Sequence, residues 1–92
     1  MNRKAKGNRN EYRTMRLLES LGYTCFRMAG SFGLFDVIDI SAIDVLLVHV
    51  KSNRFRRKVE IEAISKLETP VDCGKVIYVW QDRESVPLVT GL

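Results

Sequence analysis

Three side chains at the ends of two short apolar segments are of the types that hydrolyse phosphodiesters. The segment 44-DVLLVHVK-51 predicts a buried strand, and it ends on His49 and Lys51, which lie two residues apart and so on one face. Asp36 begins the apolar segment before it, 36-DVIDI-40. A carboxylate and a second ligand can hold a divalent cation that activates water, while a lysine stabilises charge that builds on phosphorus. In the structural alternative, Asp36 caps a strand, His49 is a satisfied half-buried side chain and Lys51 only opens a loop.

Whether these side chains meet depends on the loop between the two segments. A two-residue turn at Ala42–Ile43 would place Asp36 directly opposite His49, because opposed residues then have numbers that sum to an odd value. A loop with an odd number of residues would separate them. Asp39 and Asp44 flank this turn and are expected to be turn and solubilising residues.

Hydrophobic periodicity and turn residues predict an α/β protein with a mixed sheet of four or five strands flanked by two helices. An antiparallel hairpin comes first, and a helical crossover then joins it to a parallel strand. In the second helix, Glu60 and Glu62 are expected to face the solvent. The expected elements are a helix over 8–21, strands over 23–28, 36–40 and 44–50, a helix over 59–68, a strand over 75–81 and an edge strand over 86–90.

Length and composition predict one intracellular domain. The chain has 92 residues, of which 46% are hydrophobic and 28% charged, so we expect a single domain over 1–92 with residues 1–7 as a basic arm that can be flexible. No apolar run approaches the ~20 residues that span a bilayer, and no apolar segment follows the basic N-terminus as in a secretory signal. Cys25 and Cys73 are expected to be reduced thiols. We therefore expect no membrane partner.

The net charge of +4 is concentrated in two basic clusters, within residues 1–16 and 51–58, while the rest of the chain is net acidic. Two such clusters favour a polyanionic partner, because each cation that meets a phosphate releases a counterion. Solvated loops are the alternative. The clusters indicate nucleic-acid binding without identifying the nucleic acid.

Four segments, taken in order, resemble a known family. The run 7-GNRNEYRTMRLLESLGY-23, the turn 27-RMAGS-31, Asp36 and 49-HVK-51 are similar in spacing to the archaeal-type Holliday junction resolvases of the PD-(D/E)xK nuclease superfamily. The resemblance is close over residues 5–52, and elsewhere it extends only to the order of elements. It implies a restriction-endonuclease-like core and a homodimeric, Mg²⁺-dependent endonuclease that acts on branched or otherwise structured DNA.

The resemblance also implies residue roles. Glu11, Asp36, His49 and Lys51 would be catalytic. The metal would be bound by Asp36, His49 and the backbone carbonyl of Val50, with Glu11 as an optional further ligand. The residues that would contact DNA are Arg3, Lys4, Lys6, Arg9, Arg13, Arg27, Ser31, Arg54, Arg56, Arg57 and Lys58.

Two positions depart from the family pattern. His49 stands where the family has a glutamate, and Tyr12 stands where it tends to have an arginine. Neutral imidazole binds divalent transition metals well but suits Mg²⁺ poorly, because hard Mg²⁺ prefers oxygen ligands. The sequence therefore leaves two hypotheses open: a nuclease with a histidine ligand that prefers Mn²⁺, and a catalytically inactive DNA-binding module on the same fold.

Overall fold

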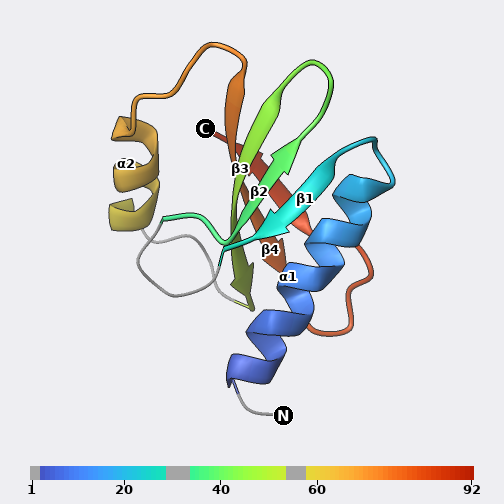
Figure 1. Ribbon diagram of the computed structural model, residues 1–92. Helices are drawn as coiled ribbons and strands as arrows, with labels where there is room; N and C mark the ends of the chain where they lie inside the picture. The colour runs from blue at the N-terminus through green and yellow to red at the C-terminus, as the bar shows by residue number, and fades with distance from the viewer. Residues whose placement is uncertain (1–2, 29–33, 54–57) are drawn as a thin grey trace.

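The computed structural model describes residues 3–28, 34–53 and 58–92, with residues 3–6 described by their backbone only. Within these ranges, two helices and five strands follow one another in sequence, and Figure 1 shows their arrangement. Their bounds are α1 Arg3–Glu19, β1 Thr24–Arg27, β2 Val37–Ile40, β3 Val45–Ser52, α2 Lys58–Lys66, β4 Cys73–Trp80 and β5 Leu88–Gly91.

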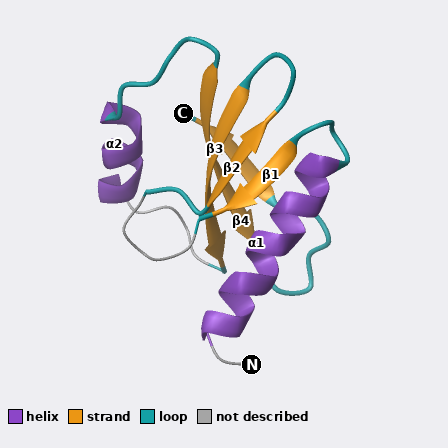
Figure 2. Cartoon of the chain, viewed as in Figure 1, coloured by secondary structure: helices purple, strands orange, loops and turns teal. Residues whose placement is uncertain are grey.

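The five strands form one mixed sheet in the order β1-β2-β3-β4-β5. All neighbouring strands pair antiparallel except β3 and β4, which are parallel and are joined by the α2 crossover. The two helices lie apart from each other, on either side of the sheet (Figure 2). The predicted fold class, a mixed sheet flanked by two helices, is confirmed.

Alternation along the strands divides the core into two layers. On the α1 side, Leu18 packs with Val37, Val48 and Tyr78. Successive side chains of a strand point to opposite faces, so the residues next to Tyr78 along β4 belong to the other layer. That layer contains Ile64 of α2 with Ile77 and Val79. Odd-numbered positions of β3 such as Leu47 face α2, and His49 and Lys51 continue that row.

The β2–β3 hairpin has the register that the sequence predicted. Val37 lies opposite Val48, and the Ser41 N–H donates to the Asp44 carbonyl at 2.9 Å, so that Ala42 and Ile43 form the two-residue turn. Just before the paired residues, the Asp36 N–H donates to the Val48 carbonyl at 2.8 Å, and the Asp36 side chain lies near His49, as the sequence predicted.

Helix α1 begins at Arg3, earlier than the predicted start at residue 8, and it includes most of the segment expected as an arm. The prediction rested on the helical spacing of Tyr12, Met15, Leu18 and Leu21, and residues 3–7 do not extend that apolar pattern. Tertiary contacts support the earlier start, because the Asn10 amide donates to Ser52 Oγ at 2.6 Å and Asn8 accepts from Arg27.

The expectation for Asp39 was wrong. Asp39 is fully buried on the α1 side of β2, and neither of its carboxylate oxygens has a hydrogen-bond partner within the described ranges. Burial raises the pKa of Asp39 to about 6, an effect that the nearby Cys25 thiol partly offsets. Asp44 does lie at the turn, where it accepts from Ser41 Oγ at 2.6 Å and Tyr23 Oη at 3.0 Å.

The substitution Asp39→Asn is expected to stabilise the protein in neutral and alkaline solution. The folded-state pKa of Asp39 lies above its ordinary value of 3.8, so the cost of ionising it in the fold appears as the pH rises above 3.8 and is complete above about 6. The neutral amide of asparagine removes that cost. A pKa shift of roughly two units corresponds to about 2–3 kcal/mol of stability.

Urea unfolding at several pH values would measure this effect. The variant should exceed the wild type in stability near pH 8 and match it near pH 4. Asp72→Asn, at an exposed aspartate, is the control and should change little at either pH. A stability difference that stayed constant with pH would contradict the assignment of the effect to ionisation.

A lysine from the sheet caps the end of α2. Lys75 Nζ of β4 donates to the carbonyls of Ile64 at 2.9 Å, Ser65 at 3.1 Å and Leu67 at 2.8 Å. The last carbonyls of a helix lack partners within it, and they carry the negative end of its dipole. Lys75 therefore satisfies carbonyls that would otherwise depend on solvent, and it ties α2 to β4.

Lys75→Met should destabilise the protein by about 1–2 kcal/mol, because charge-assisted hydrogen bonds to these carbonyls are lost. Lys66→Met, at an exposed lysine in the same helical turn, should cost less, about 0.3–0.5 kcal/mol, because it loses only the interaction with the helix dipole. Chemical unfolding of both variants measures the difference, and equal losses would show that Lys75 acts only as a surface charge.

Candidate functional site

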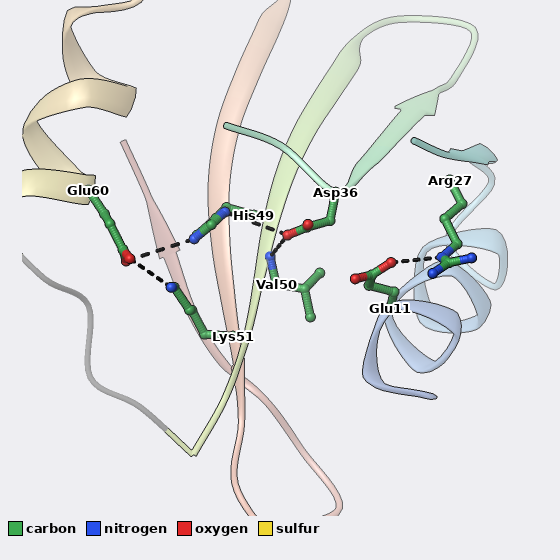
Figure 3. Close-up of polar contacts among 7 residues, drawn as sticks. All are labelled: Glu11, Arg27, Asp36, His49, Val50, Lys51 and Glu60. Atoms are coloured by element: carbon green, nitrogen blue, oxygen red, sulfur yellow. Dashed lines mark hydrogen bonds and ion pairs between the residues drawn. The ribbon is translucent and has the colours of Figure 1, made fainter. Parts of the chain in front are cut away.

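Asp36 lies at the start of β2, where its side chain turns toward β3. Its Oδ2 accepts a hydrogen bond from the Val50 N–H at 2.8 Å and lies 3.5 Å from His49 Nδ1 (Figure 3). The side chain is 32% exposed. The backbone N–H holds the carboxylate in a fixed position that remains open to solvent.

His49 extends from β3 between two carboxylates. Its Nδ1 faces Asp36, and its Nε2 lies 3.8 Å from Glu60 Oε2 (Figure 3). Both ring nitrogens are buried, and neither has a hydrogen-bond partner among the residues that the structure describes. A buried imidazole flanked by carboxylates is a donor set that fits a divalent cation.

Lys51, one alternation further along β3, reaches the same glutamate. Lys51 Nζ lies 2.7 Å from Glu60 Oε1, and the Lys51 side chain is 21% exposed. Glu60 belongs to the first turn of α2, and its side chain is 27% exposed. The prediction that Glu60 faces solvent was therefore wrong.

Sequence spacing gave no direct signal for Glu60, because the crossover that separates it from Lys51 has no periodic pattern. An indirect signal was available. A lysine beside a buried strand needs an acidic partner, and Glu60 is the first acid after Lys51 in the sequence.

Glu11 lies on the other side of Asp36 in Figure 3 and is paired with an arginine. Arg27 Nε lies 2.7 Å from Glu11 Oε1, and the guanidinium also reaches Asn8 and lies 5.2 Å from the centre of the Tyr12 ring. Helix α1, which carries Glu11, packs against the face opposite to that of α2. The structure thus groups Asp36, His49 and Lys51 but gives Glu11 a different partner.

The predicted metal ligands form no ready-made cage. Within residues 3–28, 34–53 and 58–92, no three His, Cys, Asp or Glu side chains are arranged to hold a metal ion. Val50 enters the site through its N–H, and the role of its carbonyl stays a prediction. The donor atoms of Asp36 and His49 are of types that bind divalent cations, but the described side chains do not form a complete coordination sphere.

The residues predicted to bind DNA have several different environments. Arg9 and Lys58 are exposed, Arg27 pairs with Glu11, and Arg13 stacks over the Trp80 ring at 4.0 Å. Ser31, Arg54, Arg56 and Arg57 lie outside the described residues, as do the side chains of Arg3, Lys4 and Lys6. No described helix is long and apolar enough to cross a membrane.

Neither a protein-family model nor a curated protein matches the chain. Among solved structures, the chain is similar to Hjc, a Holliday junction resolvase from the archaeal hyperthermophile Archaeoglobus fulgidus, with a TM-score of 0.73. The similarity covers 94% of this chain and 72% of that one at 19% sequence identity. The chain therefore has the fold of an archaeal-type Holliday junction resolvase.

Proposed function

We propose that this protein is a divalent-metal-dependent endonuclease that hydrolyses phosphodiester bonds in branched DNA, including Holliday junctions. The observation that carries the proposal is the register of the β2–β3 hairpin, which brings Asp36 to 3.5 Å from His49 beside Lys51. Similarity in fold to a resolvase supports the choice of branched DNA. Because its substrate would be DNA, we expect the protein to be intracellular.

Asp36 and His49 would hold the cation, together with the Val50 carbonyl and, as an optional ligand, Glu11. When bound, Mg²⁺ or Mn²⁺ would polarise the scissile phosphate and acidify an attacking water. The Val50 N–H fixes Asp36 for this role, because it holds Oδ2 at 2.8 Å while the side chain stays partly open to solvent. His49 favours Mn²⁺ over Mg²⁺ on the grounds of ligand softness.

Lys51 would stabilise the charge that develops on the phosphate oxygens. Its side chain is half-buried, and a positive charge held there acts more strongly than it does in bulk water. Ser31 and Arg27 would lie near the scissile phosphate, as the family resemblance implies.

The electrostatics of one end of the molecule suit a polyanion. The N-terminal end of α1 and the C-terminal end of β3 lie toward the same end of the molecule, and the N-terminal end of α2 faces that end (Figure 1). Helix N-termini carry partial positive charge, and the exposed Arg9 and Lys58 lie near them. A homodimer would present two such ends to the two strands of a symmetric junction.

The second candidate is a catalytically inactive DNA-binding module on the same fold. It is favoured by the position of His49, whose ring lies between two carboxylates in a described region that has no three-donor metal cluster. Such a module would bind DNA with strong salt dependence and would cut nothing with any divalent metal.

Asp36→Asn and Lys51→Ala should each abolish cutting, with losses of about 10²-fold or more, while leaving DNA binding largely intact. A labelled four-way junction and its matching linear duplex, each with Mg²⁺ and with Mn²⁺, provide the assay. Symmetric cuts in the junction by the wild type establish the resolvase activity, and nicking of both substrates indicates a broader nuclease. Unchanged cutting in either variant would disprove the assigned site.

His49→Glu separates the two candidates. If the wild type cuts with Mn²⁺ alone, the variant should gain cutting with Mg²⁺, because a carboxylate oxygen replaces the imidazole. If the wild type cuts with neither metal and binds the junction tightly, the inactive module is favoured, and Mg²⁺-dependent cutting by the variant would identify His49 as the cause. A wild type that cuts equally well with both metals would refute the expected role of His49.

A further inference from the structure

We propose that Glu60 is a positioning residue for Lys51. Its carboxylate, carried by helix α2, holds the lysine ammonium in one place beside His49 and leaves it able to contact a phosphate. This inference rests on the proposed function, since it concerns the same site. It gives Glu60 a role through Lys51 and no part in binding the cation.

The position of Lys51 explains why it needs such a partner. Lys51 is the last residue but one of β3, on the face of the sheet that α2 covers. A lysine side chain has many rotamers, so its ammonium occupies many positions unless a partner holds it. Glu60 Oε1 lies 2.7 Å from Lys51 Nζ, a distance typical of a charge-assisted hydrogen bond. The ion pair therefore selects one position of the ammonium.

The ion pair does not use up the ammonium. An ammonium group has three N–H donors and no acceptor, and the contact with Glu60 Oε1 occupies one donor. The side chains of Lys51 and Glu60 are 21% and 27% exposed, so the pair is partly open to solvent. A phosphate oxygen can therefore accept from Lys51 while Glu60 stays in contact with it.

The packing of α2 fixes the direction of Glu60. Ile64 follows Glu60 by one helical turn and is completely buried against the sheet, so Glu60 projects from the same face of the helix. Lys75 holds the other end of α2 through its three carbonyl contacts. Glu62, in contrast, is exposed. Glu60 is thus a carboxylate on a helix that is itself held in place.

The geometry around His49 separates Glu60 from the proposed metal ligands. Asp36 Oδ2 lies 3.5 Å from His49 Nδ1, whereas Glu60 Oε2 lies 3.8 Å from His49 Nε2 (Figure 3). The two carboxylates face opposite nitrogens of one ring, so they do not surround a common position for a cation. This leaves Asp36 and His49 for the cation and assigns Glu60 to the lysine.

The ammonium of Lys51 can be observed directly by NMR in the full chain, without DNA or metal. An ion-paired ammonium exchanges its protons slowly enough to give an N–H signal at low temperature, and Lys51→Met would identify that signal by its absence. Glu60→Gln should broaden the signal or remove it, because the charged partner is lost. The matched control Glu62→Gln, on the exposed face of the same helix, should keep it. Lys75, held by three carbonyls, serves as an internal reference.

Cutting of the labelled four-way junction with Mn²⁺ measures whether a held ammonium matters. Glu60→Gln should lower the single-turnover rate by about tenfold to a hundredfold, while KM for the junction and the affinity for Mn²⁺ stay within about twofold of the wild type. Glu60→Asp, which keeps the charge on a shorter side chain, should recover part of the rate. Glu62→Gln should cut as the wild type does.

A double variant tests whether Glu60 acts through Lys51. Lys51→Met combined with Glu60→Gln should cut no more slowly than Lys51→Met alone, because both changes act on one ammonium. Thermal melting of each variant would verify that the fold is kept.

The outcomes distinguish this inference from the proposed function. An unchanged Lys51 signal or an unchanged cutting rate in Glu60→Gln would overturn the role of Glu60 and leave the nuclease standing. Faster cutting by Glu60→Gln would also overturn it, because the carboxylate would then restrain Lys51 without aiding it. Loss of Mn²⁺ binding in Glu60→Gln would overturn it by making Glu60 a ligand. A wild type that cuts nothing would refute both proposals.

Discussion

The pairing of β2 with β3 determines which side chains can act together. A two-residue turn fixes the pairing, and a shift by one residue would move Asp36 to the face of α1 while His49 and Lys51 stayed with α2. The apolar residues enforce the same choice, because Val37 and Val48 are both completely buried on the α1 side. The packing of the core and the arrangement of the polar site are thus set by a single register.

The sheet separates a buried carboxylate from a half-buried one. Asp39 points into the apolar layer under α1, where burial raises its pKa to about 6. Asp36 directly precedes the same strand and faces the other side, with a backbone N–H donor and partial access to solvent. Both residues are aspartates in one five-residue segment. Because side chains alternate between the two faces of the sheet, Asp39 costs stability, whereas Asp36 is a candidate for a chemical role.

The local sequence pattern was sufficient to predict the helices and strands, the hairpin and the grouping of Asp36 with His49. Turn length and the alternation of side chains are properties of neighbouring residues. The local pattern was insufficient for Glu60 and Asp39. The position of Glu60 depends on how the crossover returns α2 to the sheet, a contact that no local spacing encodes. Asp39 was assigned to the surface because a charged residue near a turn is normally solvated, whereas the packing of α1 over β2 buries it. The early start of α1 at Arg3 has a similar cause, since contacts with Ser52 and Arg27 compensate for weak helix formers.

The cap that Lys75 places on α2 has a consequence for the order of folding. The hairpin that carries Asp36, His49 and Lys51 is local and can form early, because its closure involves only a short loop. Helix α2 gains its cap only after β4 has paired in parallel with β3, which closes a much longer segment of chain. The ion pair between Glu60 and Lys51 therefore depends on the pairing of β3 with β4, and a chain whose crossover has opened would keep the hairpin but lose this ion pair.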